Sequence, residues 1–462
     1  MNSILQLKGR FEQRSNRSRP GSPKLPKGKS VSASHLRELE KQLERILVYW
    51  TENKDIRGAL VSVHYKHIVA KSNRLKILLS ENGKSPTESI RGAKFVWEPD
   101  QKGNEVQKHV FTHFVSLQAI EKSIDVLKKT ASIIEQYYKG SVPSEVIEEL
   151  GEKYHFNEVP KTSFLKTVVD GFYVERFDID RATEEITEEA IITIYQIGVD
   201  TKRLLSKFGI DIVDDRIIDG TTLRLNPDEV KLLYNNASYL IAMGVTDFSE
   251  ISRDDVLDAY EDMEEEAGLL IPHPQNEPVI GVIDTQFNEK VYFHEWVEYK
   301  NLLDPNIPLS RKDYEHGTAV SYIIVDGPQG NPELADGCGR FRVRHFGVAT
   351  NNGFSSFTVL KMIRNIVASN RDIKVWNLSL GSKLEIKPNF ISPEAAELDR
   401  IQSEYDVIFV VAGTNIPAGV TKKNMRIGFP ADSLNSMVVN AVDFAGNSAS
   451  YTRIGPVLSF FL

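Results

Sequence analysis

The last two fifths of the chain place three reactive side-chain types beside apolar runs. Asp284 follows Val-Ile-Gly-Val-Ile, His316 precedes Gly-Thr-Ala-Val-Ser, and Asn415 follows Val-Ile-Phe-Val-Val-Ala-Gly-Thr. An aspartate can orient an imidazole, an imidazole can act as a general base, and an asparagine amide can donate to an oxyanion. Singly, each residue is more typical of a helix cap or a turn. Together and in this order, they predict an oriented imidazole beside an oxyanion donor.

The pattern beyond residue 278 predicts an α/β fold with a doubly wound parallel sheet. Near-continuous Val/Ile runs alternate with helical segments, which indicates strands that are buried on both faces. Sites in such sheets lie just past the carboxyl ends of strands, where Asp284 and Asn415 fall. The expected strands are 279–283, 346–349, 373–380, 407–412 and 437–442, and the expected helices are 318–325, 355–369 and 393–404.

Length and composition limit the class of protein, its partners and its compartment. A chain of 462 residues with 41% hydrophobic and 26% charged residues has material for several soluble domains. Its net charge of −8 argues against a nucleic-acid or anionic-membrane partner. A single cysteine, Cys338, excludes an intrachain disulfide. With no apolar signal segment, the sequence predicts a cytoplasmic protein.

The residues before position 278, where the predicted α/β domain begins, divide into three parts. Residues 1–30 hold eight Lys and Arg residues against Glu12 alone, and we expect a disordered basic tail, either free or docked on an acidic partner or on the chain's own body. Residues 31–140 predict an α+β module. Its expected elements are helices at 34–50 and 119–138 and strands at 59–65 and 109–117.

Residues 145–267 predict a mixed α/β accessory region. The expected elements are an extended run at 172–179, helices at 188–208 and 227–239, and a strand at 222–225. The acidic run 261–266 is typical of a solvated helix face, and the proline-rich stretch 271–278 indicates a linker into the last domain, 278–462.

Residues 278–462 resemble the subtilisin-like serine peptidases, the subtilases. The resemblance rests on Val-Ile-Asp284-Thr, His316-Gly-Thr-Ala-Val, Trp-Asn-Leu-Ser379-Leu-Gly381 and Val-Val-Ala-Gly-Thr-Asn415, with Phe-Pro-Ala and Val-Val-Asn-Ala-Val-Asp segments after them. It implies that His316 is the general base, that Asp284 orients it, and that Asn415 donates to the oxyanion. It also implies that Ser379, Leu380 and Gly381 offer backbone groups to an extended peptide substrate, in the manner of strand addition.

Two departures from the family pattern stand out. The family's Ala-Gly-Asn is written here as Ala412-Gly-Thr-Asn415, which shifts the asparagine by one residue. No Gly-Thr-Ser-x-Ala nucleophile segment occurs, and no serine after Asn415 has its glycine turn and following apolar helix; these serines are Ser433, Ser436, Ser448, Ser450 and Ser459. We therefore expect a partial peptidase domain that is inactive in this chain alone.

Several alternatives stay open. The chain is either a serine endopeptidase by family or a pseudopeptidase that keeps a peptide-binding or regulatory groove. The 31–140 module is either propeptide-like or an accessory recognition domain, and a separate regulatory protein partner is conceivable without any motif that names it. His294-Glu-Trp-Val-Glu298 lacks the second histidine of a zinc helix, and the two Gly-Lys-Ser segments lack the rest of a phosphate loop. We expect no metal site and no cofactor.

Overall fold

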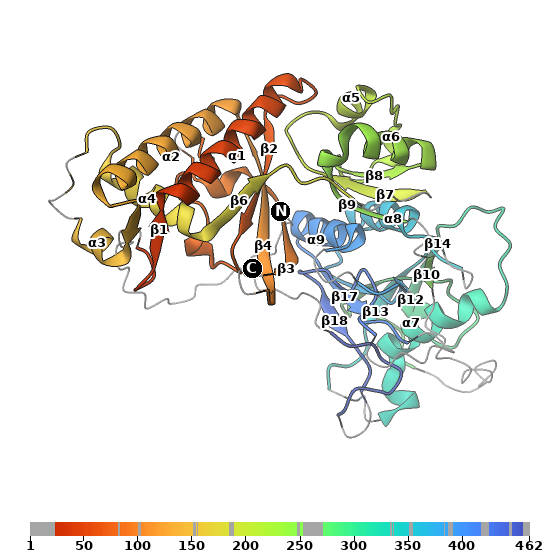
Figure 1. Cartoon of the computed structure of the whole chain (residues 1–462). Helices are drawn as coiled ribbons and strands as arrows, with labels where there is room; N and C mark the ends of the chain where they lie inside the picture. Colours follow the sequence, from red (N-terminus) through yellow and green to blue (C-terminus); the bar gives the residue numbers. More distant parts are fainter. Residues whose placement is uncertain are drawn as a thin grey trace.

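The computed structural model describes three units that follow one another along the chain (Figure 1). The described residues are 24–81, 84–99, 103–150, 154, 156–183, 189–246, 250–252, 271–332, 335, 337–350, 354–382, 384–386, 391–416, 425–442 and 446–455. Most of the predicted basic tail and the acidic run 261–266 lie outside them.

The first unit packs helices on one face of an antiparallel sheet. Its sheet has the order β3-β4-β2-β6, and α1 packs against α2 (Figure 1). Ser32 caps α1, because its side chain accepts from the His35 amide. The elements are β1 (Ser30–Ser32), α1 (Ala33–Glu52), β2 (Ala59–Tyr65), β3 (Ile90–Pro99), β4 (Glu105–Val115), α2 (Leu117–Tyr137), β5 (Ser141–Pro143), α3 (Ser144–Glu149), α4 (Lys161–Tyr173) and β6 (Val174–Asp178).

The second unit is a three-stranded antiparallel sheet with two helices. The predicted helix at 188–208 is wrong: its first part is strand β7, and only its last part is helical. The β-branched run Ile191-Ile-Thr-Ile194 favours a strand, and Gly198 takes a left-handed φ of 73° between this strand and α5, which interrupts any continuous helix. The elements are β7 (Ala190–Ile194), α5 (Thr201–Ser206), β8 (Thr222–Leu225), α6 (Pro227–Ala237) and β9 (Ile241–Thr246).

The third unit confirms the predicted α/β fold. Six strands, all parallel, form a sheet of order β12-β13-β11-β15-β17-β18. Helices α8 and α9 share a buried core with one face, and α7 packs on the other. The elements are β11 (Val279–Asp284), β12 (Val297–Asn301), α7 (Lys312–Gly330), β13 (Arg342–Gly347), β14 (Phe354–Ser355), α8 (Ser356–Ser369), β15 (Val375–Leu378), β16 (Gly381–Ser382), α9 (Pro393–Tyr405), β17 (Ile408–Ala412) and β18 (Met437–Val439).

One face of this sheet is apolar and exposed over its last three strands. Pairing places Val375 beside Ile408, and Met437 beside Val410, on the same face. Val375 and Ile408 are each 39% exposed, Met437 is 59% exposed and Val439 is 53% exposed. Strands of a parallel sheet are normally covered on both faces. This face is therefore as apolar as a buried sheet face, and no helix among the described residues covers it.

Polar contacts join the second unit to the third. Asp219 forms an ion pair with Arg400 on α9, and the Asp215 carbonyl oxygen accepts from Lys361 Nζ on α8. Strand β10 (Glu250–Ser252) then pairs antiparallel with both β14 and β16, so that it forms the middle strand of a small sheet. The segment that precedes the linker thus lies against the third unit.

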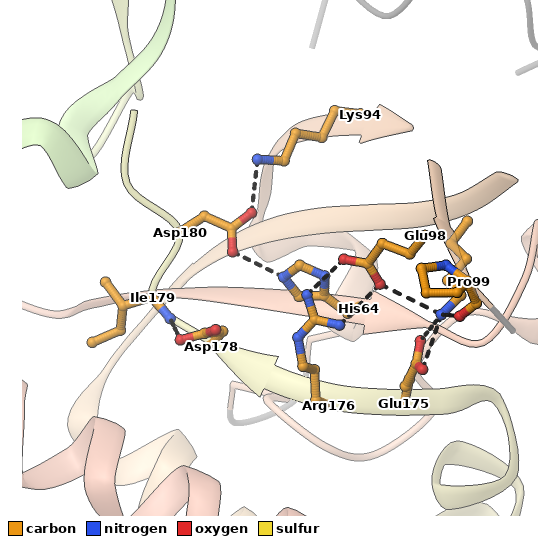
Figure 2. Close-up of polar contacts among 10 residues, drawn as sticks. His64, Lys94, Glu98, Pro99, Glu175, Arg176, Asp178, Ile179 and Asp180 are labelled. Carbon is orange, nitrogen blue, oxygen red and sulfur yellow. Dashed lines mark hydrogen bonds and ion pairs between the residues drawn. The ribbon is translucent and has the colours of Figure 1, made fainter. Parts of the chain in front are cut away.

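The first unit carries a network of charged side chains on its sheet (Figure 2). Arg176 on β6 bonds both carboxylate oxygens of Glu98 on β3, at 2.8 and 3.1 Å. Lys108 is buried and donates to Glu175 at 2.8 Å. The hydrogen bond from Arg176 holds the pKa of Glu98 at about 2, although partial burial acts in the opposite direction. Glu98 thus stays ionised across the neutral range.

We expect Arg176→Gln to reduce the acid sensitivity of the first unit. Because the pKa of Glu98 is depressed on folding, its stabilisation is complete above about pH 5 and is lost as the pH falls toward 2. The variant should cost about 1 kcal/mol at pH 7 and almost nothing at pH 2. Urea unfolding at both pH values measures this. Arg45→Gln, at an exposed pair, is the control, and an equal cost at both pH values for Arg176→Gln would contradict the assignment.

Candidate active site

The third unit brings Asp284 and His316 into direct contact. Asp284 is the last residue of β11, and His316 lies in the second turn of α7. The Asp284 Oδ1 atom is 2.6 Å from His316 Nδ1, the carboxylate side chain is fully buried, and the imidazole is 12% exposed. Because the carboxylate accepts, Nδ1 carries the proton, and a neutral ring then holds its basic lone pair on Nε2.

Hydrogen bonds from the backbone amides of Thr285 and Gly317 hold the Asp284–His316 pair in place. The Thr285 amide donates to Asp284 Oδ1 at 2.6 Å, and the Gly317 amide donates to Thr285 Oγ1 at 3.0 Å. A Cβ atom on Gly317 would lie 2.6 Å from the Gln286 carbonyl oxygen. Only glycine therefore allows the helix that carries His316 to approach the end of β11 so closely.

The electrostatics of the pair favour an ionised aspartate. Burial acts to raise the pKa of Asp284, but the charge and hydrogen bond of His316 outweigh it and leave this pKa below its ordinary value. An ionised, buried carboxylate at 2.6 Å stabilises the imidazolium that forms when His316 accepts a proton. The pair can therefore act as an oriented general base.

The predicted peptide-binding strand lies beside an extended segment of the chain itself. Ser379 and Leu380 follow β15, and Gly381 begins β16. Ser252 of β10 pairs antiparallel with Gly381. Gly381 thus takes part in backbone strand addition in this structure, with residues of the chain in the place where the sequence predicts a peptide.

Asn415 follows β17, two strands from β11 in the sheet. The extra residue of Ala-Gly-Thr-Asn is accommodated because Thr414 takes a left-handed φ of 68°, while its Oγ1 accepts from the Gly428 amide at 2.9 Å. The Asn415 backbone pairs with Thr452 in an isolated bridge. Asn415 thus lies at the carboxyl edge of the sheet, and its role as an oxyanion donor stays a prediction.

Arg453 is a site residue that the sequence reasoning missed. It is 1% exposed, and its Nε donates to the Asn415 carbonyl oxygen at 2.8 Å. Its Nη1 lies 3.3 Å from the Ser382 carbonyl oxygen and 3.4 Å from that of Leu384. One buried guanidinium thus connects the loop that carries Asn415 to β16 and the residues after it. Its setting in the sequence, Tyr-Thr-Arg-Ile, has no motif that would have signalled this.

We expect Arg453→Met to destabilise the third unit by about 3 kcal/mol or more. The substitution fills similar volume but leaves buried carbonyl oxygens without their donor, and each such loss costs about 1–3 kcal/mol. Chemical denaturation measures the change. The control is Arg371→Met at an exposed arginine of the same unit, which should change stability by less than about 0.5 kcal/mol. Equal effects of the two substitutions would refute the role given to Arg453.

Comparisons with known proteins agree with the predicted family. The sequence model of the subtilase family matches residues 275–461. No curated protein matches the sequence. Among solved structures, the prenylagaramide maturation protease PagA is 17% identical with a TM-score of 0.30, over 39% of this chain and 59% of that one. The patellamide maturation protease PatA is 14% identical with a TM-score of 0.30, over 39% of this chain and 62% of that one.

A variant of the epidermin leader peptide processing serine protease of Staphylococcus aureus is also similar in structure. It is 17% identical, with a TM-score of 0.37, over 58% of this chain and 74% of that one. The chain thus spans about three fifths of the length of the PagA and PatA structures.

Proposed function

Residues 275–461 belong to the subtilase family, and from that premise we propose that the chain acts in peptide-bond hydrolysis as a subtilisin-like serine-type endopeptidase. The observation that carries the proposal is the contact of 2.6 Å between the buried Asp284 carboxylate and His316 Nδ1. In this role His316 takes the proton of a serine nucleophile and later returns it to the leaving amine. Asp284 holds the imidazole in the tautomer that this requires.

Asn415 and the strand at 379–381 complete the proposed machinery. The Asn415 side chain donates to the oxyanion of the tetrahedral intermediate, and the backbone of Ser379, Leu380 and Gly381 aligns a polypeptide substrate. The pairing of Gly381 with Ser252 supports the second role, because it is the same kind of backbone addition. No cofactor or metal is needed for this chemistry.

The nucleophile is the part of the triad that this sequence does not supply in its usual motif. The exposed apolar face formed by Val375, Ile408, Met437 and Val439 supports that view, because an amphipathic helix is the element that covers such a sheet face. We place the serine on a helix that covers this face and that follows a Gly-Thr-Ser-x-Ala turn. The 462-residue chain alone is then inactive.

The accessory residues act in this proposal as an occupant of the peptide groove. Strand β10 lies between β14 and β16, where a substrate strand would compete with it. The ion pair of Asp219 with Arg400 holds the second unit on α9. We propose this role for β10, and whether 31–140 is propeptide-like or an accessory recognition domain stays open.

Identification of new peptide termini tests the proposal. A form of the chain extended through a Gly-Thr-Ser-x-Ala segment is incubated with a peptide mixture, and mass spectrometry identifies the products. We expect internal cleavages by the extended form and none by its His316→Ala variant. Cleavages that persist in the variant would overturn the assignment of the base.

The second candidate is a pseudopeptidase that binds peptides or regulates another protein. The pairing of β10 with β14 and β16 favours it, since this strand of the chain is held there without cleavage chemistry. The oriented Asp284–His316 pair favours the enzyme, because a binding module has no need of a general base. A folded extended chain that binds peptides and cleaves none would decide for the pseudopeptidase.

The proposal extends to the cellular location of the chain and to its partners. We propose a cytoplasmic location, which fits the single cysteine. As a separate finding, none of the helices in the described residues could span a membrane. We propose polypeptide as the substrate class and a separate regulatory protein as a partner. Nucleic acid and membrane are not among the proposed partners.

A further inference from the structure

A second histidine, His345, is buried beside the Asp284–His316 pair. It lies on β13, where its backbone is paired with Val282 of β11, and its side chain has no exposed surface. Its ring packs against Phe287 and Tyr299. A Cβ atom on Gly317 would lie 2.8 Å from His345 Cε1, so the ring touches the turn of α7 that carries His316.

Both ring nitrogens of His345 have defined partners. The Nε2 atom is 2.8 Å from the Thr285 carbonyl oxygen, and the Nδ1 atom is 2.9 Å from Ser321 Oγ on α7. A carbonyl oxygen only accepts, so Nε2 carries the proton and Nδ1 accepts from the Ser321 hydroxyl. Burial lowers the pKa of His345, which favours this neutral form.

These bonds make Thr285 a junction of the site. Its amide donates to Asp284, its hydroxyl accepts from the Gly317 amide, and its carbonyl oxygen accepts from His345. The side chain of His345 thus links the turn after Asp284 to the helix that carries His316. An apolar residue would fill the same space without the cost of burying polar atoms. A histidine at this position therefore indicates that its two directional hydrogen bonds, to Thr285 and Ser321, have a structural role.

We propose that His345 is a positioning residue that holds the Thr285 turn and thereby sets the geometry between Asp284 and His316. The inference rests on the proposed function only in the role given to that pair. His345 itself touches neither a nucleophile nor a substrate, and it acts through Thr285. The other ionisable groups that face it are Asp284, His316 and the Tyr299 ring.

A matched pair of amide substitutions tests the proposal in the 462-residue chain. His345→Gln places an amide nitrogen where Nε2 lies and can keep the bond to Thr285, whereas His345→Asn is too short to reach it. NMR titration of the His316 ring and its low-field Nδ1 proton report on the Asp284–His316 pair directly. We expect the His316 midpoint to fall by about one pH unit, with loss of the low-field signal, in His345→Asn. His345→Gln should stay close to the parent chain.

The controls separate positioning from a general loss of structure. His113 is also fully buried and bonded to a serine, but it lies on β4 of the first unit, so His113→Gln should leave the His316 titration unchanged. Circular dichroism confirms folding of each variant. A parent-like His316 signal in folded His345→Asn, or an equal change in His345→Gln, would overturn the proposal. Neither readout needs a serine, so the result is independent of whether an extended chain cleaves peptides.

Discussion

Peptide hydrolysis by the 462-residue chain is expected to run about 10⁶-fold below that of a form with the complete triad. The reason is that an oriented base without a nucleophile cannot form an acyl-enzyme. In subtilisin, loss of the serine alone costs about 2 × 10⁶ in kcat, about as much as loss of the whole triad. An assay with internally quenched peptides, run side by side on the two forms, measures the ratio.

The control for this comparison is the extended form with its motif serine changed to alanine. It should fall to the level of the 462-residue chain, because both then have the same two triad members. If the 462-residue chain hydrolysed peptides within about tenfold of the extended form, a serine among its own residues would be the nucleophile. The proposed arrangement of the site would then be wrong.

Asp284→Asn in the extended form is expected to lower kcat by about 10⁴ with little change in KM. The asparagine amide can donate toward Nδ1, which favours the ring tautomer with its proton on Nε2 and removes the base. In trypsin-like enzymes the equivalent change costs about 10⁴ in kcat. Steady-state kinetics at a fixed pH give both constants. KM is spared because the Asp284 side chain is fully buried and so cannot bind substrate directly.

A buried aspartate elsewhere in the same unit provides the matched control. Asp326 is 3% exposed and accepts from Tyr292 and Arg340, in a network that does not include His316. Asp326→Asn should lower stability and leave kcat near that of the parent. An equal fall in kcat for the two variants would mean that the loss at Asp284 reflects folding rather than catalysis.

Much of the third unit follows from its sequence. Its strands are unbroken Val/Ile runs, and parallel order places their carboxyl ends at one edge, so the meeting of Asp284 with His316 is predictable from the order of the elements. Strand β12 was not predicted, because Val297-Glu-Tyr-Lys-Asn301 is a polar edge strand with little apolar signal.

Residues that act through long-range contacts could not be predicted from the sequence. Arg453 bonds to carbonyl oxygens that lie 38 to 71 positions away, and His345 meets Thr285 across 60 positions. No local period or spacing encodes such pairs. The wrong helix at 188–208 has a different cause, since a short β-branched strand and a short helix were joined into one amphipathic pattern. Sequence patterns thus predict elements and motifs better than they predict the residues whose long-range contacts stabilise them.

Labelling with a fluorophosphonate probe tests whether Asp284 and His316 activate a serine nucleophile. The probe reacts with an activated serine, and mass spectrometry locates the modified residue. The account predicts one labelled serine in the Gly-Thr-Ser-x-Ala segment of the extended form, no label after His316→Ala, and no label on the 462-residue chain. A folded extended form that stays unlabelled, or one that His316→Ala leaves fully labelled, would contradict it.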